Sequence, residues 1–116
     1  MHDPLAGAEV LTKAHELITG ARQKSYSHPY EDYSRTVSIY NALKGEDLMT
    51  AEDGILFMVC VKLSRLMHEL ESGQNLPDNL IDAAGYLGCL AMVREHLRYT
   101  DIELARMFKT GESWDS

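Results

Sequence analysis

The sequence predicts an all-α protein, organised as one compact bundle of about five helices. Two observations carry this prediction: strand patterns are nearly absent, and apolar residues recur at helical spacing from end to end. With 116 residues, 45% of them hydrophobic, the chain has the size of one domain with its own core. We therefore expect a single domain over residues 1–116, with residues 112–116 as a frayed tail.

The first two predicted helices have clear start and stop signals. An apolar stripe over residues 10–21 predicts the first helix, and Asp3-Pro4 is a start signal upstream of it. The segment 25–33, with serines, a proline and three tyrosines, is predicted to be a loop. The second helix is expected over about 32–43 and should end at Lys44-Gly45, since glycine commonly terminates helices.

A central antiparallel hairpin is predicted from the next two helices. Thr50 followed by Asp53 resembles a capping box and opens the first arm, at about 50–72. The second arm is expected over about 77–98, where an early carboxylate suits the positive end of a helix. A short fifth helix is predicted from Thr100, with Glu103 completing a second capping box.

Two features of the hairpin predict close helix contacts and a homo-oligomer. Gly85 and Gly88 share one stripe of the second arm, so either the first arm or a second subunit should approach closely there. The segment 55–61 is apolar on every side, and five short helices can hardly enclose it. We therefore expect a homo-oligomer, most simply a twofold dimer.

Charge and hydropathy exclude several classes of protein. The net charge is −7, from 18 acidic and 11 basic residues, and no window gathers enough cations to track phosphates, so we expect no binding to duplex nucleic acid or anionic membranes. No apolar run approaches the length of a bilayer span, and the N-terminus does not resemble a signal peptide, so a cytoplasmic location is expected. Cys60 and Cys89 are predicted to be reduced thiols that neighbour each other in the core.

Charged residues on the apolar arms of the hairpin mark the candidate site. Lys62 and Arg65 lie on the first arm, and Asp78, Asp82 and Tyr86 follow i, i+4, i+8 spacing on the second. Residues equally far from the turn should lie side by side, which places Arg65 near Asp82 and Lys62 near Tyr86. Three interpretations stay open: salt bridges that fix the register of the hairpin, a ligand site, or a solvated face.

A ligand site of this composition suits a nucleotide or another phosphorylated small molecule. Arg65 offers a bidentate fork and Lys62 a point charge for phosphate oxygens. Asp78 and Asp82, with Glu69 across the hairpin, are oxygen ligands of the kind that Mg²⁺ prefers.

Aromatic residues upstream of the hairpin offer a surface for stacking. Tyr26, His28 and Tyr33 lie within eight positions of one another and could wall a nucleotide base. The alternative is a loop that aromatic packing pins to the bundle.

Three segments of the sequence carry a family resemblance. Residues 23–29 with Tyr33, then Lys-Leu-Ser-Arg-Leu at 62–66, then Asp-Asn-Leu-Ile-Asp with Gly-Tyr at 78–86, resemble a family of small, uncharacterised all-α proteins of bacteriophages and prophages. That family is similar to the nucleotide-modification-associated domains and, more distantly, to the MazG-like all-α nucleoside triphosphate pyrophosphatases. The resemblance covers about residues 22–92 and implies an all-α fold that binds a nucleotide.

The chain departs from the pyrophosphatases at the metal site. Those enzymes carry a Glu-x-x-Glu pair on one helix and a Glu-x-x-Asp pair on the next, which together bind magnesium. Lys62 and Arg65 stand at the first pair and Asn79 and Asp82 at the second, so only Asp82 matches cleanly.

Whether the chain is an enzyme therefore stays open, and no catalytic residue is identified. If it catalyses a reaction, the resemblance implies a MazG-like nucleotide pyrophosphohydrolase, but the exchange of two carboxylates for two cations argues against the same metal cluster. The alternative function is a non-enzymatic helical interaction module that binds a host or phage protein.

Overall fold

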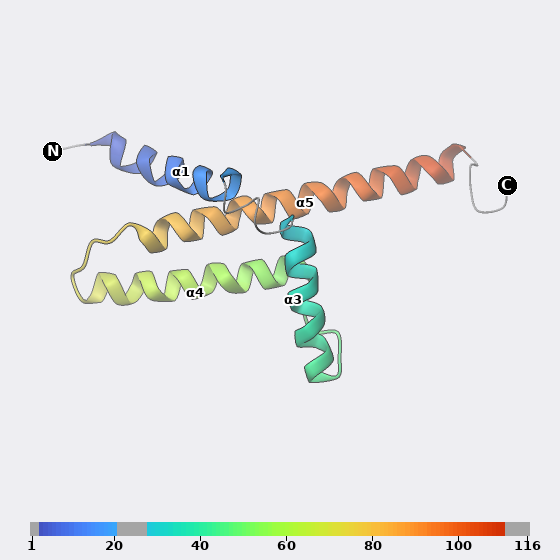
Figure 1. The fold of residues 1–116 in the computed structure, drawn as a ribbon, viewed down its shortest axis with the longest axis horizontal. Helices are drawn as coiled ribbons and strands as arrows, with labels where there is room; N and C mark the ends of the chain where they lie inside the picture. Colours follow the sequence, from blue (N-terminus) through green and yellow to red (C-terminus); the bar gives the residue numbers. More distant parts are fainter. Residues whose placement is uncertain (1–2, 21–27, 111–116) are drawn as a thin grey trace.

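The computed structural model describes residues 3–20 and 28–110, and these form helices without any strand. Figure 1 shows their arrangement. The four described helices are α1 (Pro4–Thr19), α3 (Pro29–Lys44), α4 (Ala51–Glu71) and α5 (Asp78–Thr110). None of them is both long and apolar enough to cross a membrane.

The first residues of α1 and α3 are each set by a local capping interaction, and only that of α1 was predicted. Asp3 caps α1 by accepting a hydrogen bond from the Leu5 backbone N–H at 3.0 Å, as the start signal predicted. The predicted loop at 25–33 is wrong from Pro29 onward, because α3 already begins there. Proline lacks the N–H that a first helical turn leaves unpaired, and the Nδ1 atom of His28 caps the helix by accepting from the Tyr30 N–H.

α4 begins at the predicted capping box, with reciprocal hydrogen bonds between Thr50 and Asp53. α5 is one continuous helix of 33 residues, so the separate fifth helix is a wrong prediction. The Thr100 hydroxyl donates to the His96 carbonyl inside the helix, at 3.0 Å, instead of capping a new one. No glycine or proline interrupts residues 89–110, so the helix has no reason to break.

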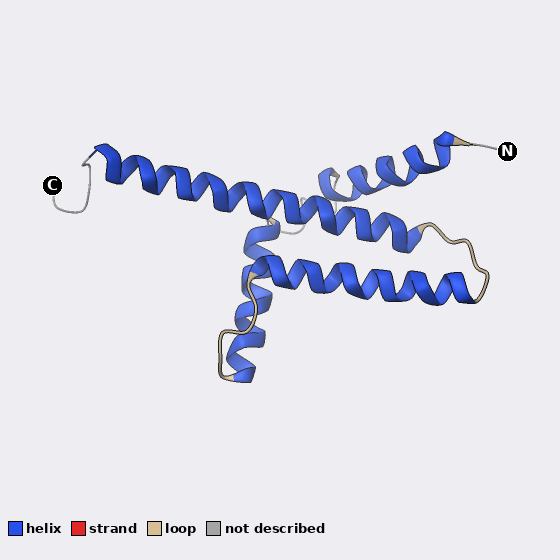
Figure 2. Ribbon diagram, turned by 180° about the vertical axis from the view of Figure 1, so that it is seen from behind, coloured by secondary structure: helices blue, strands red, loops and turns tan. Residues whose placement is uncertain are grey.

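The helices do not form the compact bundle that the sequence predicted. The molecule measures 66 × 36 × 24 Å, and its radius of gyration is 18.5 Å, against about 13 Å for a compact chain of this length. Figures 1 and 2 show α4 running back beside the first half of α5 and α1 on the other side of α5. α3 starts beside α5 and runs past the beginning of α4. The second half of α5 extends beyond the other helices.

Close contacts between helices occur at two glycines. A Cβ on Gly54 of α4 would lie 2.8 Å from Val37 Cγ1 of α3, and a Cβ on Gly88 of α5 would lie 2.8 Å from Ile18 Cδ1 of α1. The helix that approaches the glycines of α5 is therefore α1, which neither sequence-based alternative named.

The core lies where α3, α4 and α5 meet, around Ala51, Ile55 and Val93. Not all of the apolar segment 55–61 is enclosed, since Phe57 is 61% exposed. The cysteines are not buried neighbours, because Cys60 is exposed while Cys89 is partly buried against the core.

Candidate functional site

The interface between α4 and α5 contains polar side chains in positions that usually hold apolar ones. Lys62 of α4 forms an ion pair with Asp82 of α5, with Nζ 3.1 Å from Oδ2. Their side chains are only 14% and 32% exposed, so both charges are substantially withdrawn from water. Such a pair is stabilising only if the contact between the two charges offsets the cost of removing them from solvent.

Arg65 does not take the place that the sequence predicted for it. It is exposed and forms no ion pair within the described parts of the chain, while its expected neighbour Asp82 pairs with Lys62. Distance from the turn fixes the height of a residue along a hairpin but not the direction of its side chain. Arg65 follows Lys62 by three positions and is therefore rotated by about 60° away from α5.

Glu69 is the buried acidic side chain of this interface. It follows Lys62 by seven positions, which brings it to the same face of α4. The Asn79 amide of α5 donates a hydrogen bond to Glu69 Oε1, whereas Oε2 is buried without a hydrogen-bond partner in the described residues. A buried carboxylate oxygen without a donor is destabilising, so this atom is a natural place for a further polar group.

Two tyrosines continue the polar interface towards the core. Tyr86 lies one turn beyond Asp82 on α5, and Tyr33 reaches it from α3. Burial raises the pKa of Tyr33 well above its usual value, with smaller contributions from the nearby Tyr86 hydroxyl, to which it is hydrogen bonded, and from Asp32. Burial likewise raises the pKa of the Cys89 thiol, so this group stays protonated and unreactive at neutral pH.

We name this row of polar groups the polar seam. Its α5 residues extend from Asn79 to Tyr86, over about 10 Å of helix. Asn79 is the member that the sequence analysis missed as a site residue. Lys62 and Glu69 lie seven residues apart on α4, and Asn79 and Asp82 lie three residues apart on the facing helix. These two polar pairs on facing helices are the signal that would have identified Asn79. The polar seam consists of Tyr33, Lys62, Glu69, Asn79, Asp82 and Tyr86.

The remaining predicted site residues lie outside the polar seam or outside the described structure. Asp78 is exposed at the start of α5, and Tyr26 falls outside the described residues. His28 lies at the start of α3 with its ring centroid 5.7 Å from that of His96. His96 is ten positions beyond Tyr86, about 15 Å along α5, so His28 is not brought to the polar seam.

The described residues contain no group of three or more histidine, cysteine, aspartate or glutamate side chains placed to hold a metal ion. Asp78, Asp82 and Glu69 therefore do not form a ready-made metal cage. An ion bound here would draw most of its ligands from water or from a phosphorylated ligand, as magnesium commonly does.

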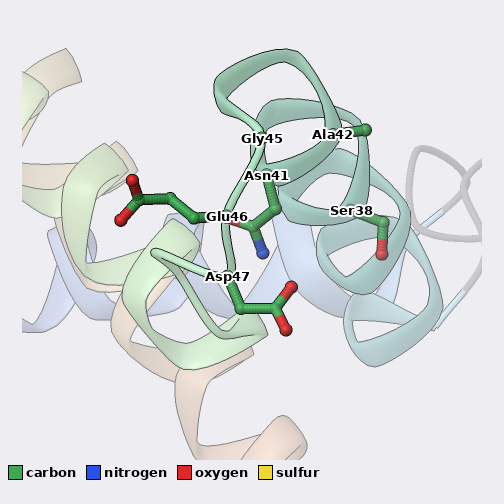
Figure 3. Close-up of a pocket in the computed structure, with 6 residues that line it drawn as sticks. All are labelled: Ser38, Asn41, Ala42, Gly45, Glu46 and Asp47. Atoms are coloured by element: carbon green, nitrogen blue, oxygen red, sulfur yellow. The ribbon is translucent and has the colours of Figure 1, made fainter.

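A pocket is found elsewhere, between the end of α3 and the loop that leads to α4. Figure 3 shows its lining, with the Glu46 and Asp47 carboxylates extending to opposite sides of Asn41. The Asn41 amide is already committed to the loop: it donates to the Met49 carbonyl at 2.9 Å and accepts from the Leu48 and Met49 N–H groups. Its other lining residues are Ser38, Ala42 and Gly45. The hydrogen bonds of Asn41 hold the loop in place. The polar side chains that line the pocket do not point towards one common ligand position.

These features define a class: an elongated all-α protein with a polar seam between two packed antiparallel helices. Residues 9–94 match a family described as a domain of unknown function, DUF6378. The match spans most of the chain. The chain therefore belongs to this family.

Two phage proteins are similar to the chain. It is 35% identical over 107 residues to the Gene 55 protein of Mycobacterium phage L5, covering 92% of this chain and 62% of the relative. It is 28% identical over 86 residues to the Gene 55 protein of Mycobacterium phage D29, covering 74% of this chain and 54% of the relative. The chain thus spans less than two thirds of either relative, and no solved structure matches it.

The comparisons agree with the predicted phage family of uncharacterised function. They add no link to nucleotide-modification domains or to MazG-like pyrophosphatases.

Proposed function

We propose that the polar seam binds a phosphorylated small molecule, most simply a nucleotide, in the cytoplasm of the host cell. The observation that carries the proposal is the buried Oε2 atom of Glu69, which has no hydrogen-bond partner among the described residues and lies on the same face of α4 as the partly buried Lys62. Fixing the register of a hairpin needs one complementary pair, and the polar seam holds one buried and several partly buried polar groups. Several polar groups at an interface, one of them an acceptor atom without a donor, are typical of sites where a bound ligand supplies the missing partner.

In this proposal the two cations of α4 bind the phosphates. Arg65 is exposed, and its guanidinium offers a bidentate fork. Lys62 exchanges part of its contact with Asp82 for a phosphate oxygen. Asp82, with Asp78 or Glu69, would then share a magnesium ion with the phosphates.

We propose binding without rapid hydrolysis. Two cations stand where the resembling pyrophosphatases carry their first acidic pair, so the magnesium ligands of that pair are missing. Tyr33 and Tyr86 supply hydroxyl groups at the inner end of the polar seam, where they suit the orientation of a ligand.

Calorimetry with deoxynucleoside triphosphates and magnesium tests the proposal. We expect heat of binding for the parent and an affinity at least about tenfold lower for the double variant Lys62→Ala, Arg65→Ala, since each charge-assisted contact contributes about 1.5–3 kcal/mol. The matched control is Arg35→Ala, Lys44→Ala, which removes the same charge from exposed positions of α3. The nucleoside alone should bind far more weakly than its triphosphate.

Two outcomes would contradict ligand binding at the polar seam. One is the absence of heat across canonical and modified nucleotides. The other is equal affinity in the parent and the Lys62→Ala, Arg65→Ala variant, which would leave these charges a structural role.

A second candidate function is an interaction module that binds a host or phage protein. The observation that favours it is the second half of α5, which extends beyond the other helices and exposes Tyr99, Ile102 and Leu104. Exposed apolar groups on a projecting helix suit helix-in-groove recognition. A complex that forms with the parent but not with an Ile102→Ser, Leu104→Ser variant, without any nucleotide effect on melting, would favour this function over the first.

A further inference from the structure

One side of α4 is covered by another helix and the other side is not. Ile55 is fully buried in the core, the preceding Gly54 lies under α3, and the following Leu56 is 44% exposed. Consecutive helical residues point about 100° apart, so Gly54 and Leu56 mark opposite flanks of this helix.

The same pattern recurs on α5. Tyr86 packs against the core, the preceding Gly85 lies against Ile18 of α1, and the following Leu87 is 51% exposed. Because α4 and this part of α5 run in opposite directions (Figure 1), the same sense of rotation leads to the same side of the pair. Thus α1 and α3 cover one side, and Leu56 and Leu87 lie together on the uncovered side.

The uncovered side continues as a regular apolar stripe. On α4, exposed apolar residues follow one another at alternating spacings of four and three, which is the heptad pattern of helices that pack against other helices. Two leucines on α5 lie one heptad apart on the same side. We call this set the apolar face: Leu56, Cys60, Leu63, Met67 and Leu70 of α4, with Leu80 and Leu87 of α5.

The exposed area of the chain matches what a stable dimer buries. The accessible surface is 8813 Å², against about 6,400 Å² for a compact monomer of 13.1 kDa, so each chain exposes roughly 2,400 Å² more than expected. Obligate homodimers bury about 2,000–5,000 Å² in total, or up to about 2,500 Å² per chain. The whole elongated chain contributes to this excess, including the projecting second half of α5, and the total is on the scale that an obligate interface buries.

We propose that a second copy of this chain covers the apolar face, so that two α4–α5 pairs form a four-helix core around a twofold axis. The seven residues of the face are uncharged, and the Glu52–Arg94 ion pair lies beside it, one turn before Leu56 and one heptad beyond Leu87. Both charges of this pair come from the same chain, so pairing the face with itself buries no uncompensated charge. A heptad stripe on each copy supplies the matching partner for the other.

Sedimentation equilibrium at micromolar concentration tests this proposal, independently of any ligand. We expect the parent to have twice the 13.1 kDa chain mass, and Leu63→Glu, at the centre of the apolar face, to have the mass of one chain. The control Leu43→Glu makes the same change at an 81% exposed position of α3 and should stay dimeric. A parent with the mass of a single chain, or a Leu63→Glu variant that remains dimeric, overturns the proposal.

The reactivity of Cys60 gives a readout that needs no destabilising variant. Cys60 is exposed in the single chain but lies on the apolar face, so dimerisation should slow its modification by a thiol reagent. We expect the rate to fall several-fold as protein concentration rises, with Cys60→Ser identifying the signal. A rate independent of concentration, at the full rate of an exposed thiol, overturns the proposal even if Leu63→Glu fails to fold.

Discussion

Lys62 and Glu69 show two ways in which a charged side chain is accommodated between packed helices. Lys62 has a direct partner in Asp82, and its long aliphatic stem lets the ammonium reach a partner that is still one-third exposed. Glu69 is more deeply buried, and within the described part of the chain only one of its oxygens has a hydrogen-bond partner, the Asn79 amide. In the first arrangement each charge has a partner of opposite sign, while the second leaves an acceptor atom available for a further donor.

The first prediction concerns the ion pair. Lys62→Ala should lower the free energy of unfolding by about 1–3 kcal/mol, between the values typical of exposed and buried pairs, because it leaves Asp82 partly buried without a partner. Arg65→Ala, at an exposed position of the same helix, is the matched control and should change stability little. Urea denaturation with a Lys62 and Asp82 double-mutant cycle measures the coupling. A coupling of zero, or a larger effect from Arg65→Ala, would contradict the assignment of the partner.

At the scale of elements, the sequence predicted helix ends well wherever a local signal decides them. Asp3 begins α1 and the Thr50–Asp53 capping box begins α4, as predicted. Gly45, with its φ of 79°, ends α3, also as predicted. The predictions of helix ends were wrong where one residue type is common both at the end of a helix and in a second position. Pro29 both ends and begins helices, and Thr100 caps a helix or bonds within one.

The candidate site was predicted in composition but not in pairing. The sequence singled out Lys62 and Asp82 without showing that they meet, because the tilt and rotation of two packed helices depend on all of their contacts. The packing of α3 illustrates the same dependence, since Gly54 of α4 has no side chain and so lets Val37 and Tyr33 of α3 come close to the α4 backbone. A glycine in a helix indicates a close approach, but it does not identify the helix that approaches.

The second prediction uses the Tyr33–Tyr86 contact that joins α3 to α5. The folded state holds the pKa of Tyr33 above its ordinary value near 10, and that of Cys89 above its ordinary value near 9. At alkaline pH the unfolded chain loses these protons first, so it binds fewer protons than the folded chain and stability falls as pH rises. The stabilisation is fully present below about pH 9 and is lost progressively above it.

Melting temperatures measured between pH 7 and 11 check this expectation. Tyr33→Phe should be less stable at neutral pH, because the hydrogen bond with Tyr86 is lost, but should lose less stability between pH 9 and 11. Tyr40→Phe, at a 42% exposed position of the same helix, is the control. Identical alkaline slopes for the parent and Tyr33→Phe would show that Tyr33 ionises as it does in the unfolded chain.

At the scale of the whole molecule, the elongated shape is the property that could not be predicted from the sequence. Helical periodicity shows which residues share a face, but it does not show whether that face is covered by the same chain. The sequence predicted that the segment 55–61 would exceed what one chain can enclose, and the structure exposes Leu56, Phe57 and Cys60. The polar seam lies inside the α4–α5 pair, and the apolar face lies on its flank, so the proposed ligand binding and the proposed dimerisation would use different surfaces of the same two helices.

The most direct test of the central claim, that the polar seam is a ligand site, is to locate a bound ligand on the protein. Backbone amide chemical shifts should be recorded while a deoxynucleoside triphosphate with magnesium is added. The account predicts saturable shifts concentrated in residues 62–69 of α4 and 79–86 of α5. Shifts that are absent at saturating ligand, or confined to residues 38–47 around the pocket between α3 and α4, would contradict it.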